Sequence, residues 1–113
     1  MNCYASDFHD RASCSAESWY GCRGNFYESS SCTAAGSHGC GMAQFHNNSS
    51  CVATGEYGCD GAHFFDNSYC EARVLNGCPS NSWDYTYPAY CKGPYCAAGT
   101  QRQDGSVRTE MGE

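Results

Sequence analysis

Residues 51–69 read CVATGEYGCDGAHFFDNSY, and this stretch carries the pattern that decides the fold. It follows the frame C-x-A-x-x-x-x-G-C, then an aromatic residue, Phe64, and then a polar run rich in Ser and Asn. The same frame recurs before and after it, so the chain is an internal repeat of about 19 residues. Repeats of this length predict a stacked array in which each unit contacts its neighbours.

The frame divides the chain into units with shared positions. Three positions besides cysteine recur in all four full units: the alanines Ala16, Ala34, Ala53 and Ala72, the glycines Gly21, Gly39, Gly58 and Gly77, and the aromatic residues Phe26, Phe45, Phe64 and Trp83. The frame predicts one disulfide-stapled array over 1–96, made of a partial unit 1–13, full units 14–31, 32–50, 51–69 and 70–90, and a closing loop 91–96. Residues 97–113 contain neither cysteine nor aromatic residue, which predicts a flexible tail or an assembly arm.

Cysteine replaces the usual aliphatic core. The chain of 113 residues has 11 Cys, no Ile and one Leu, so it cannot bury enough aliphatic surface to offset its conformational entropy. Five bridges closing loops of about nine residues would contribute on the order of 10 kcal/mol, comparable to the stability of an ordinary domain. Such a scaffold predicts an oxidising location: secreted, extracellular or on the cell surface. The framework comprises Cys3, Cys14, Cys22, Cys32, Cys40, Cys51, Cys59, Cys70, Cys78, Cys91 and Cys96.

Two disulfide pairings fit the spacing equally well. Bridges within each C-x7-C segment leave Cys3 unpaired and join 14–22, 32–40, 51–59, 70–78 and 91–96. Bridges across the longer gaps leave Cys96 unpaired and join 3–14, 22–32, 40–51, 59–70 and 78–91. The spacing does not choose between them.

Two conformations also fit the C-x7-C segments. In residues 68–79 a serine can cap a short helix, a glycine can end it and a proline can break it. We therefore favour a small solenoid of short helical turns joined by extended segments or loops, with the alanine facing inward and the aromatic ring buried between units. The alternative is a disulfide-laddered β-solenoid, because Gly36 and Gly55 weaken the helix in two units.

The residue pattern contains no recognisable catalytic, cofactor or metal site. Zinc and iron–sulfur sites use closely spaced cysteine pairs, and the chain has no C-x-x-C. The histidines fall at different offsets in their units, which predicts polar surface residues rather than ligands or a catalytic base. A net charge of −6 argues against nucleic acid, and no apolar run is long enough to insert into a membrane. We expect no enzymatic activity, no cofactor and no metal.

Two surface features stand out. Asn47 and Asn48 begin overlapping N-x-S sequons and are candidate sites of glycan attachment. A cluster of aromatic residues near the end of the array predicts a sticky patch for another copy of the chain: Trp83, Tyr85, Tyr87 and Tyr90.

The regular cysteines and small inward residues resemble the disulfide-laddered repeats of insect hyperactive antifreeze proteins. The Thr-x-Thr array of that family, which the resemblance would imply for ice binding, is absent: the threonines are Thr33, Thr54, Thr86, Thr100 and Thr109. The cysteine spacing also resembles that of ciliate surface antigens. An odd cysteine, an aromatic end patch and open array ends favour an extracellular structural protein that assembles end to end into a filament, coat or matrix. The alternative is a secreted binding module, such as a pheromone, toxin-like protein or ice binder, that presents a rigid repeat face.

Overall fold

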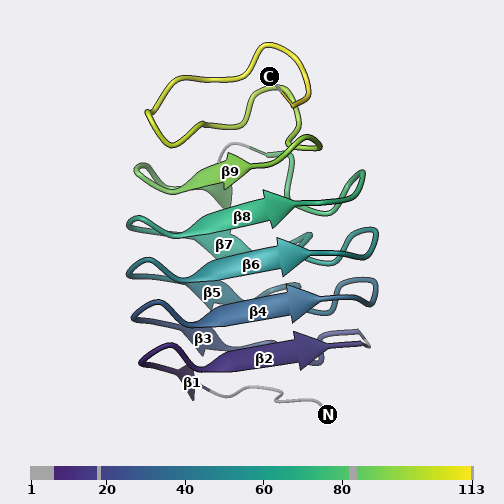
Figure 1. The fold of residues 1–113 in the computed structure, drawn as a ribbon, viewed down its shortest axis with the longest axis vertical. Coiled ribbons are helices and arrows are strands. Elements are labelled where there is room, and N and C mark those ends of the chain that lie inside the picture. Colours follow the sequence, from purple (N-terminus) through teal and green to yellow (C-terminus); the bar gives the residue numbers. More distant parts are fainter. Residues whose placement is uncertain (1–6, 18, 82–83, 113) are drawn as a thin grey trace.

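The computed structural model describes residues 7–17, 19–81 and 84–112. The chain forms a β-solenoid with almost no helix, in which coils of about 19 residues stack along one axis (Figure 1). The molecule measures 37 × 25 × 18 Å. The predicted repeat solenoid is therefore confirmed.

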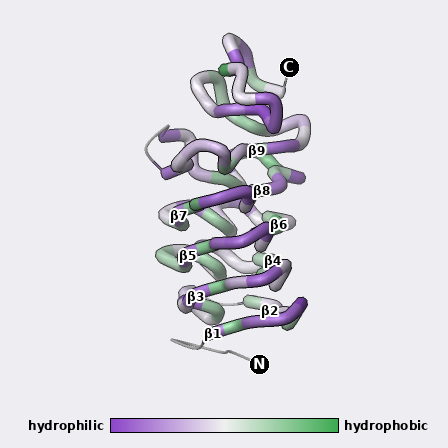
Figure 2. The backbone as a smooth tube through the Cα atoms, turned by 90° about the vertical axis from the view of Figure 1, so that its left-hand side faces the viewer, coloured by the Kyte–Doolittle hydropathy of each residue, from purple (hydrophilic) through white to green (hydrophobic). Residues whose placement is uncertain are grey.

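Each of the first four coils contributes one strand to each of two parallel sheets, and the last coil contributes a strand to the second sheet only (Figure 2). The first sheet contains β1 (Asp7–Phe8), β3 (Asn25–Phe26), β5 (Gln44–Phe45) and β7 (His63–Phe64). The second contains β2 (Ser13–Ala16), β4 (Ser31–Ala34), β6 (Ser50–Ala53), β8 (Tyr69–Ala72) and β9 (Tyr90–Lys92). Neighbouring strands pair in register, so equivalent residues of the repeat form columns along the axis.

The core is made of columns of identical residues. Successive side chains of a strand point to opposite sides, and in β2 and its equivalents the cysteine and the alanine point inward. From the other sheet, Phe8, Phe26, Phe45 and Phe64 stack with centroid separations of 4.4, 4.7 and 4.9 Å. The predicted inward alanine and buried ring are thus present, and the interior of a coil holds one phenyl ring beside small residues.

The last ring of the stack is Tyr85 and not the residue at the predicted offset. Tyr85 stacks on Phe64 at 5.3 Å and bridges its backbone. The coil between Cys70 and Cys91 is two residues longer than the coil before it, which moves the inward position along the chain. Trp83, the predicted residue, lies outside the described residues.

The helical turn favoured for the C-x7-C segments is wrong, and the strand alternative is correct. The bridges join Cys14–Cys22, Cys32–Cys40, Cys51–Cys59, Cys70–Cys78 and Cys91–Cys96. Helical rise would place residues eight apart about 12 Å from one another, whereas a disulfide requires Cα atoms within about 7 Å. The Cα atoms of Cys51 and Cys59 are 6.3 Å apart, so pairing within the segment excludes a helix across it.

Tight turns join the first sheet to the second in each coil. Asn47 and Asn48 both have positive φ, 52° and 68°, and the Ser49 N–H donates to the His46 carbonyl at 3.1 Å. These features define a type I′ turn, which Asn and Asp tolerate better than most residues. The same hydrogen bond closes the turn after Phe8, Phe26 and Phe64. In Figure 2 the stretches that connect the sheets on the visible side are mostly hydrophilic.

The glycine before the second cysteine serves close packing. The residue before this glycine has the left-handed conformation, as in His38 (φ 56°) and Tyr57 (φ 60°). A Cβ on Gly39 would lie 2.7 Å from the Cβ of Ala16 in the preceding coil. Glycine is therefore required because the loop of one coil lies directly against the alanine of the coil before it.

Residues 97–112, for which a flexible tail or assembly arm was predicted, fold over the last coil. The Cys91 N–H donates to the Gln101 carbonyl at 2.9 Å, and Gln101 pairs with Val107 in an antiparallel bridge. Thr100 and Arg108 are buried, and the Arg108 guanidinium donates to the Gln101 carbonyl at 3.1 Å. This segment, hereafter the cap, covers the C-terminal end of the solenoid (Figure 1).

Candidate functional site

The most regular surface of the molecule is the outer side of the second sheet. We call it the flat face and define it by the outward residues of β2, β4, β6, β8 and β9: Ser13, Ser15, Ser31, Thr33, Ser50, Val52, Tyr69, Glu71, Tyr90 and Lys92. Strand register arranges them in two columns. On the first three strands one column is all serine, and the other is Ser15, Thr33 and Val52. The face therefore begins as a rigid grid of small side chains.

Four of the five hydroxyl side chains of this grid are at least partly exposed and available to a ligand, whereas Ser50 is buried, with 8% of its surface exposed. Within the described part of the chain, none of the hydroxyls of Ser13, Ser15, Ser31, Thr33 and Ser50 is hydrogen-bonded to another protein group. Each hydroxyl supplies one donor and two acceptor positions. Directly beneath each outward pair lies a cysteine of the disulfide ladder, which fixes the strand from inside.

The C-terminal end of the flat face has a different chemistry. Tyr69 and Tyr90 stack at 5.3 Å, and the Lys92 ammonium lies 5.0 Å from the Tyr69 ring centroid. Glu71 forms an ion pair of 2.6 Å with Arg73. These aromatic and charged pairs mark the C-terminal boundary of the grid of small residues.

The serines that precede β4, β6 and β8 do not form a surface strip. Ser30, Ser49 and Ser68 are fully buried. Their hydroxyls donate to the carbonyls of Phe8, Phe26 and Phe45 in the preceding coil, at 3.0–3.2 Å. This buried row links adjacent coils, and its exposed neighbours form the turns.

Asn47 and Asn48 lie at the tip of one of these turns with exposed side chains. An open depression passes over the same turns and is lined by Asp10, Arg11, Glu28, Ser29, Asn47 and Asn48. The two candidate glycan acceptors therefore project at the turn edge and not from the flat face.

The histidines link coils in pairs with carboxylates. His9 contacts Glu28 at 2.9 Å and His63 contacts Asp84 at 3.3 Å, and His38 and His46 contact Asp60 and Asp66 at 3.6 Å. In each pair the carboxylate belongs to the next coil. In residues 7–17, 19–81 and 84–112, no group of three or more His, Cys, Asp or Glu side chains is arranged to hold a metal ion.

A stack of rings that includes two of the histidines was not predicted from the sequence. His9 and His46 stack with Tyr27 between them, at 4.8 and 5.1 Å, and Phe65 continues the stack. All four residues directly follow a core phenylalanine. The position directly after the core phenylalanine could have predicted the stack, whereas offsets counted from cysteine vary with turn length.

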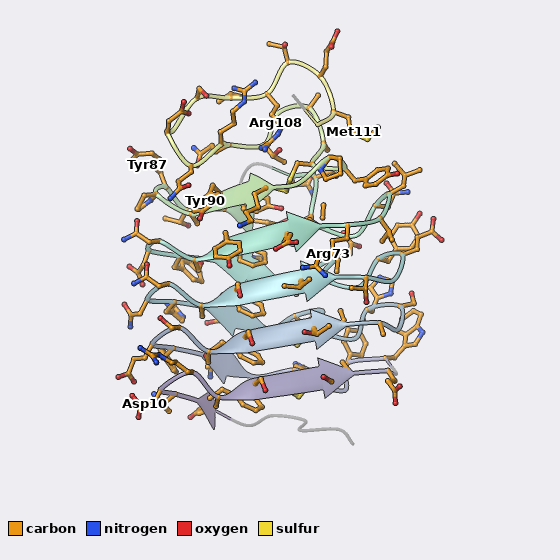
Figure 3. The ribbon with its side chains drawn as sticks, in the orientation of Figure 1. Asp10, Arg73, Tyr87, Tyr90, Arg108 and Met111 are labelled. Atoms are coloured by element: carbon orange, nitrogen blue, oxygen red, sulfur yellow. A yellow bond between two sulfur atoms is a disulfide. The ribbon has the colours of Figure 1, made fainter. Side chains whose placement is uncertain are left out.

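The predicted aromatic patch is not brought together. Tyr85 is in the core, where its hydroxyl donates to the Pro79 carbonyl at 2.8 Å, and Tyr90 is buried on the flat face. Tyr87 is 64% exposed and lies at the opposite edge from Met111 (Figure 3). Trp83 lies outside the described residues.

Burial perturbs the ionisable groups of the last coil. Desolvation raises the pKa of the Tyr85 hydroxyl well above 10, and the Asp84 charge adds to this effect. Desolvation also raises the pKa of Asp84, partly offset by His63, and it raises the pKa of Tyr90. In the cap, hydrogen bonds from Ser106 lower the pKa of the exposed Asp104.

The ten cysteines that the structure describes pair with one another. The count leaves Cys3 as the odd cysteine, as in the first of the two predicted pairings; Cys3 itself lies outside the described residues. The disulfide ladder suits an oxidising, extracellular environment. No helix in the described part of the chain is long and apolar enough to span a bilayer.

Comparisons with protein-family models, curated proteins and solved structures find no match to this chain.

Proposed function

We propose that the protein is a secreted binding module whose flat face recognises a ligand surface with a repeating pattern. The observation that carries the proposal is the double column of small side chains on β2, β4 and β6. Parallel strands repeat about every 4.8 Å, and alternate residues along a strand about every 6.6 Å. A grid with two fixed spacings matches an ordered surface better than an irregular molecule.

The disulfide ladder supports this reading because it makes the grid rigid. Each outward pair flanks a fully or almost fully buried cysteine whose partner lies across the coil. A surface that is already ordered loses little conformational entropy on binding. Weak contacts at each hydroxyl can then add up over the face.

Ice and crystalline polysaccharides are two ordered surfaces of this kind that an extracellular protein can meet. Ser and Thr hydroxyls at fixed spacing can join a lattice of hydrogen-bonded groups, and the Thr33 and Val52 methyl groups fill the space between them. Ice is the first ligand to test, because the chain resembles the disulfide-laddered insect antifreeze proteins. The strands Ser-Cys-Ser, Ser-Cys-Thr and Ser-Cys-Val present their two outward residues with the same x-Cys-x spacing, with serine, threonine or valine instead of paired threonines.

The experiment compares two lysine substitutions on central strands of opposite sheets. Thr33→Lys places a long charged side chain on β4, the middle strand of the grid, whereas Gln44→Lys does so on β5 of the first sheet. Partition into slowly growing ice, and retention on insoluble chitin and cellulose, measure binding. We expect wild type and Gln44→Lys to bind one of these surfaces and Thr33→Lys to lose at least about tenfold in binding. Equal binding of both variants, or no binding to any surface, would refute the proposal.

Self-association is the second candidate, and the two ends of the array favour a dimer over a filament. Among the described residues β1 and β2 each have a neighbouring strand on one side only, and the cap covers the other end. An edge with unpaired backbone groups is a site for strand pairing. One open end gives a closed pair of molecules, not the filament that two open ends would give.

Sedimentation velocity over a range of protein concentrations tests this candidate. A monomer–dimer equilibrium that persists after thiol alkylation would support pairing through the strand edge. Larger species that collapse to monomers on reduction would instead support the covalent filament. A monomer at all concentrations, with one band on a non-reducing gel, would exclude both.

A further inference from the structure

Exposed apolar side chains gather at one end of the solenoid. Half of the eight large apolar residues that the described surface exposes line a single pocket: Tyr57, Leu75, Tyr95 and Met111. They are 40–51% exposed. Figure 3 places Met111 at the edge of the cap, above the loops that follow β8. A cluster of exposed apolar side chains of this kind often marks a binding site.

The pocket is small and held by covalent links. Its volume is about 90 Å³, well below the roughly 300–1,000 Å³ of pockets for drug-sized ligands. Tyr57, Leu75 and Tyr95 come from three loops that are each closed by a disulfide, Cys51–Cys59, Cys70–Cys78 and Cys91–Cys96, and Met111 comes from the cap. The pocket is therefore preformed, and its size suits one ring or a short aliphatic chain.

The pocket wall has a negative charge and no positive one. Asp60 is the lining residue with a carboxylate, and neither lysine nor arginine lines the pocket. The nearest pairing group, the His38 Nε2, lies 3.6 Å from the Asp60 carboxylate, beyond a good hydrogen bond. The field of Asp60 extends to the last coil, where it adds to the burial that raises the pKa values of Asp84 and Tyr85.

We propose that this pocket binds a small organic ammonium ion with an apolar body, such as an aralkylamine. The body packs against Leu75 and Met111, and the ammonium group lies beside the Asp60 carboxylate. Tyr57 and Tyr95 supply aromatic rings, which attract cations as well as apolar groups. The pocket shares no residue with the flat face, so the proposal is independent of the ligand proposed there.

The probe is phenethylamine, and its neutral counterpart is 2-phenylethanol, which has the same ring and chain without the charge. Binding is followed by amide chemical shifts of the oxidised protein. We expect phenethylamine to bind with a millimolar Kd and to shift the amides of Tyr57, Asn76 and Tyr95. 2-Phenylethanol should bind about five- to tenfold more weakly, because it lacks the ion pair and the cation–π contact.

Two substitutions and a control separate charge from shape. Asp60→Asn should bring the two Kd values within about twofold of each other while preserving the binding of the neutral probe. Ser80→Phe fills the pocket from its wall and should abolish the binding of both probes. Met42→Ser removes an exposed apolar side chain that does not line the pocket and should change neither Kd. Equal affinity for both probes in the wild type, or shifts confined to other loops, would overturn the proposal.

Discussion

A Cβ atom placed on Gly58 would lie 2.7 Å from the Cβ of Ala34, one coil away. The same distance separates the corresponding positions of Gly39 and Ala16, and of Gly77 and Ala53. Each of these contacts pairs a glycine of one coil with an alanine of the coil before it. The small size of both residues therefore sets how closely successive coils approach.

Gly58→Ala should destabilise the protein by about 1–3 kcal/mol, because the added methyl group also meets the Ala34 carbonyl oxygen at 2.8 Å and neither backbone can move. Chemical denaturation with the disulfides intact measures the loss. Adding Ala34→Gly should recover part of it by removing the clash between the Cβ atoms. Glu56→Ala, at an exposed position in the same loop, should stay within about 0.5 kcal/mol of wild type. A tolerated Gly58→Ala would show that the coils are not fixed by this contact.

Ser49→Ala should cost about 1 kcal/mol, since the buried hydroxyl donates to the Phe26 carbonyl at 3.0 Å. The cost should not be larger, because the same carbonyl also accepts the His46 N–H at 2.8 Å and remains satisfied. Ser29→Ala makes the same change at an exposed serine and should have an effect below about 0.5 kcal/mol. Equal effects of the two substitutions would mean that the serine row does not hold coils together.

Removing a central disulfide should cost more than removing the first one. The pairs Cys51–Cys59 and Cys14–Cys22 close loops of equal length, so chain entropy assigns about 2.5 kcal/mol to each. The central pair also packs between coils on both sides, and replacing it with two alanines leaves a cavity there. Guanidinium denaturation of the two double-alanine variants should therefore show a larger loss for the central pair. A larger loss for the first pair would contradict this reasoning.

The columns could be predicted from the sequence, because a residue that recurs at a fixed offset must repeat its environment. Ala34 and Phe45 were assigned to the interior on that basis, and both are fully buried. The conformation of the C-x7-C segment could not be predicted in the same way. A capping serine and a glycine stop are compatible with a helix, and only the choice of disulfide pairing excludes it. The disulfide pairing and the conformation of the C-x7-C segment are therefore decided together.

The flat face and the pocket needed three-dimensional information for different reasons. Thr33 and Val52 share a repeat offset, but only the strand conformation makes their side chains outward neighbours on one face. A search for paired threonines also passes over serine in the same positions. The pocket joins Leu75 to Met111, which belong to segments without a shared repeat position. The cap was predicted to be a tail because its contacts, such as that of Gln101 with Cys91, are specific to the last coil.

Raising the pH above 10 should destabilise the native state through Tyr85. Burial raises the pKa of its hydroxyl well above the value of about 10 in the unfolded chain. Below pH 10 the group is protonated in both states and has no effect on the pH dependence. Above pH 10 the unfolded state releases the proton and the native state keeps it. Stability then falls as pH rises, by up to about 1.4 kcal/mol per pH unit for one proton.

Tyr85→Phe isolates this effect, since Tyr90, whose pKa is also raised by burial, is present in both proteins. At pH 7 the variant should be about 1 kcal/mol less stable, because it loses the hydrogen bond to the Pro79 carbonyl. The difference should shrink above pH 10 and reverse by about pH 11, as the wild type alone loses stability through Tyr85. Urea unfolding of thiol-alkylated protein between pH 7 and 11 measures the crossing. A constant difference over this range would mean that the Tyr85 hydroxyl ionises as readily in the native state as in the unfolded chain.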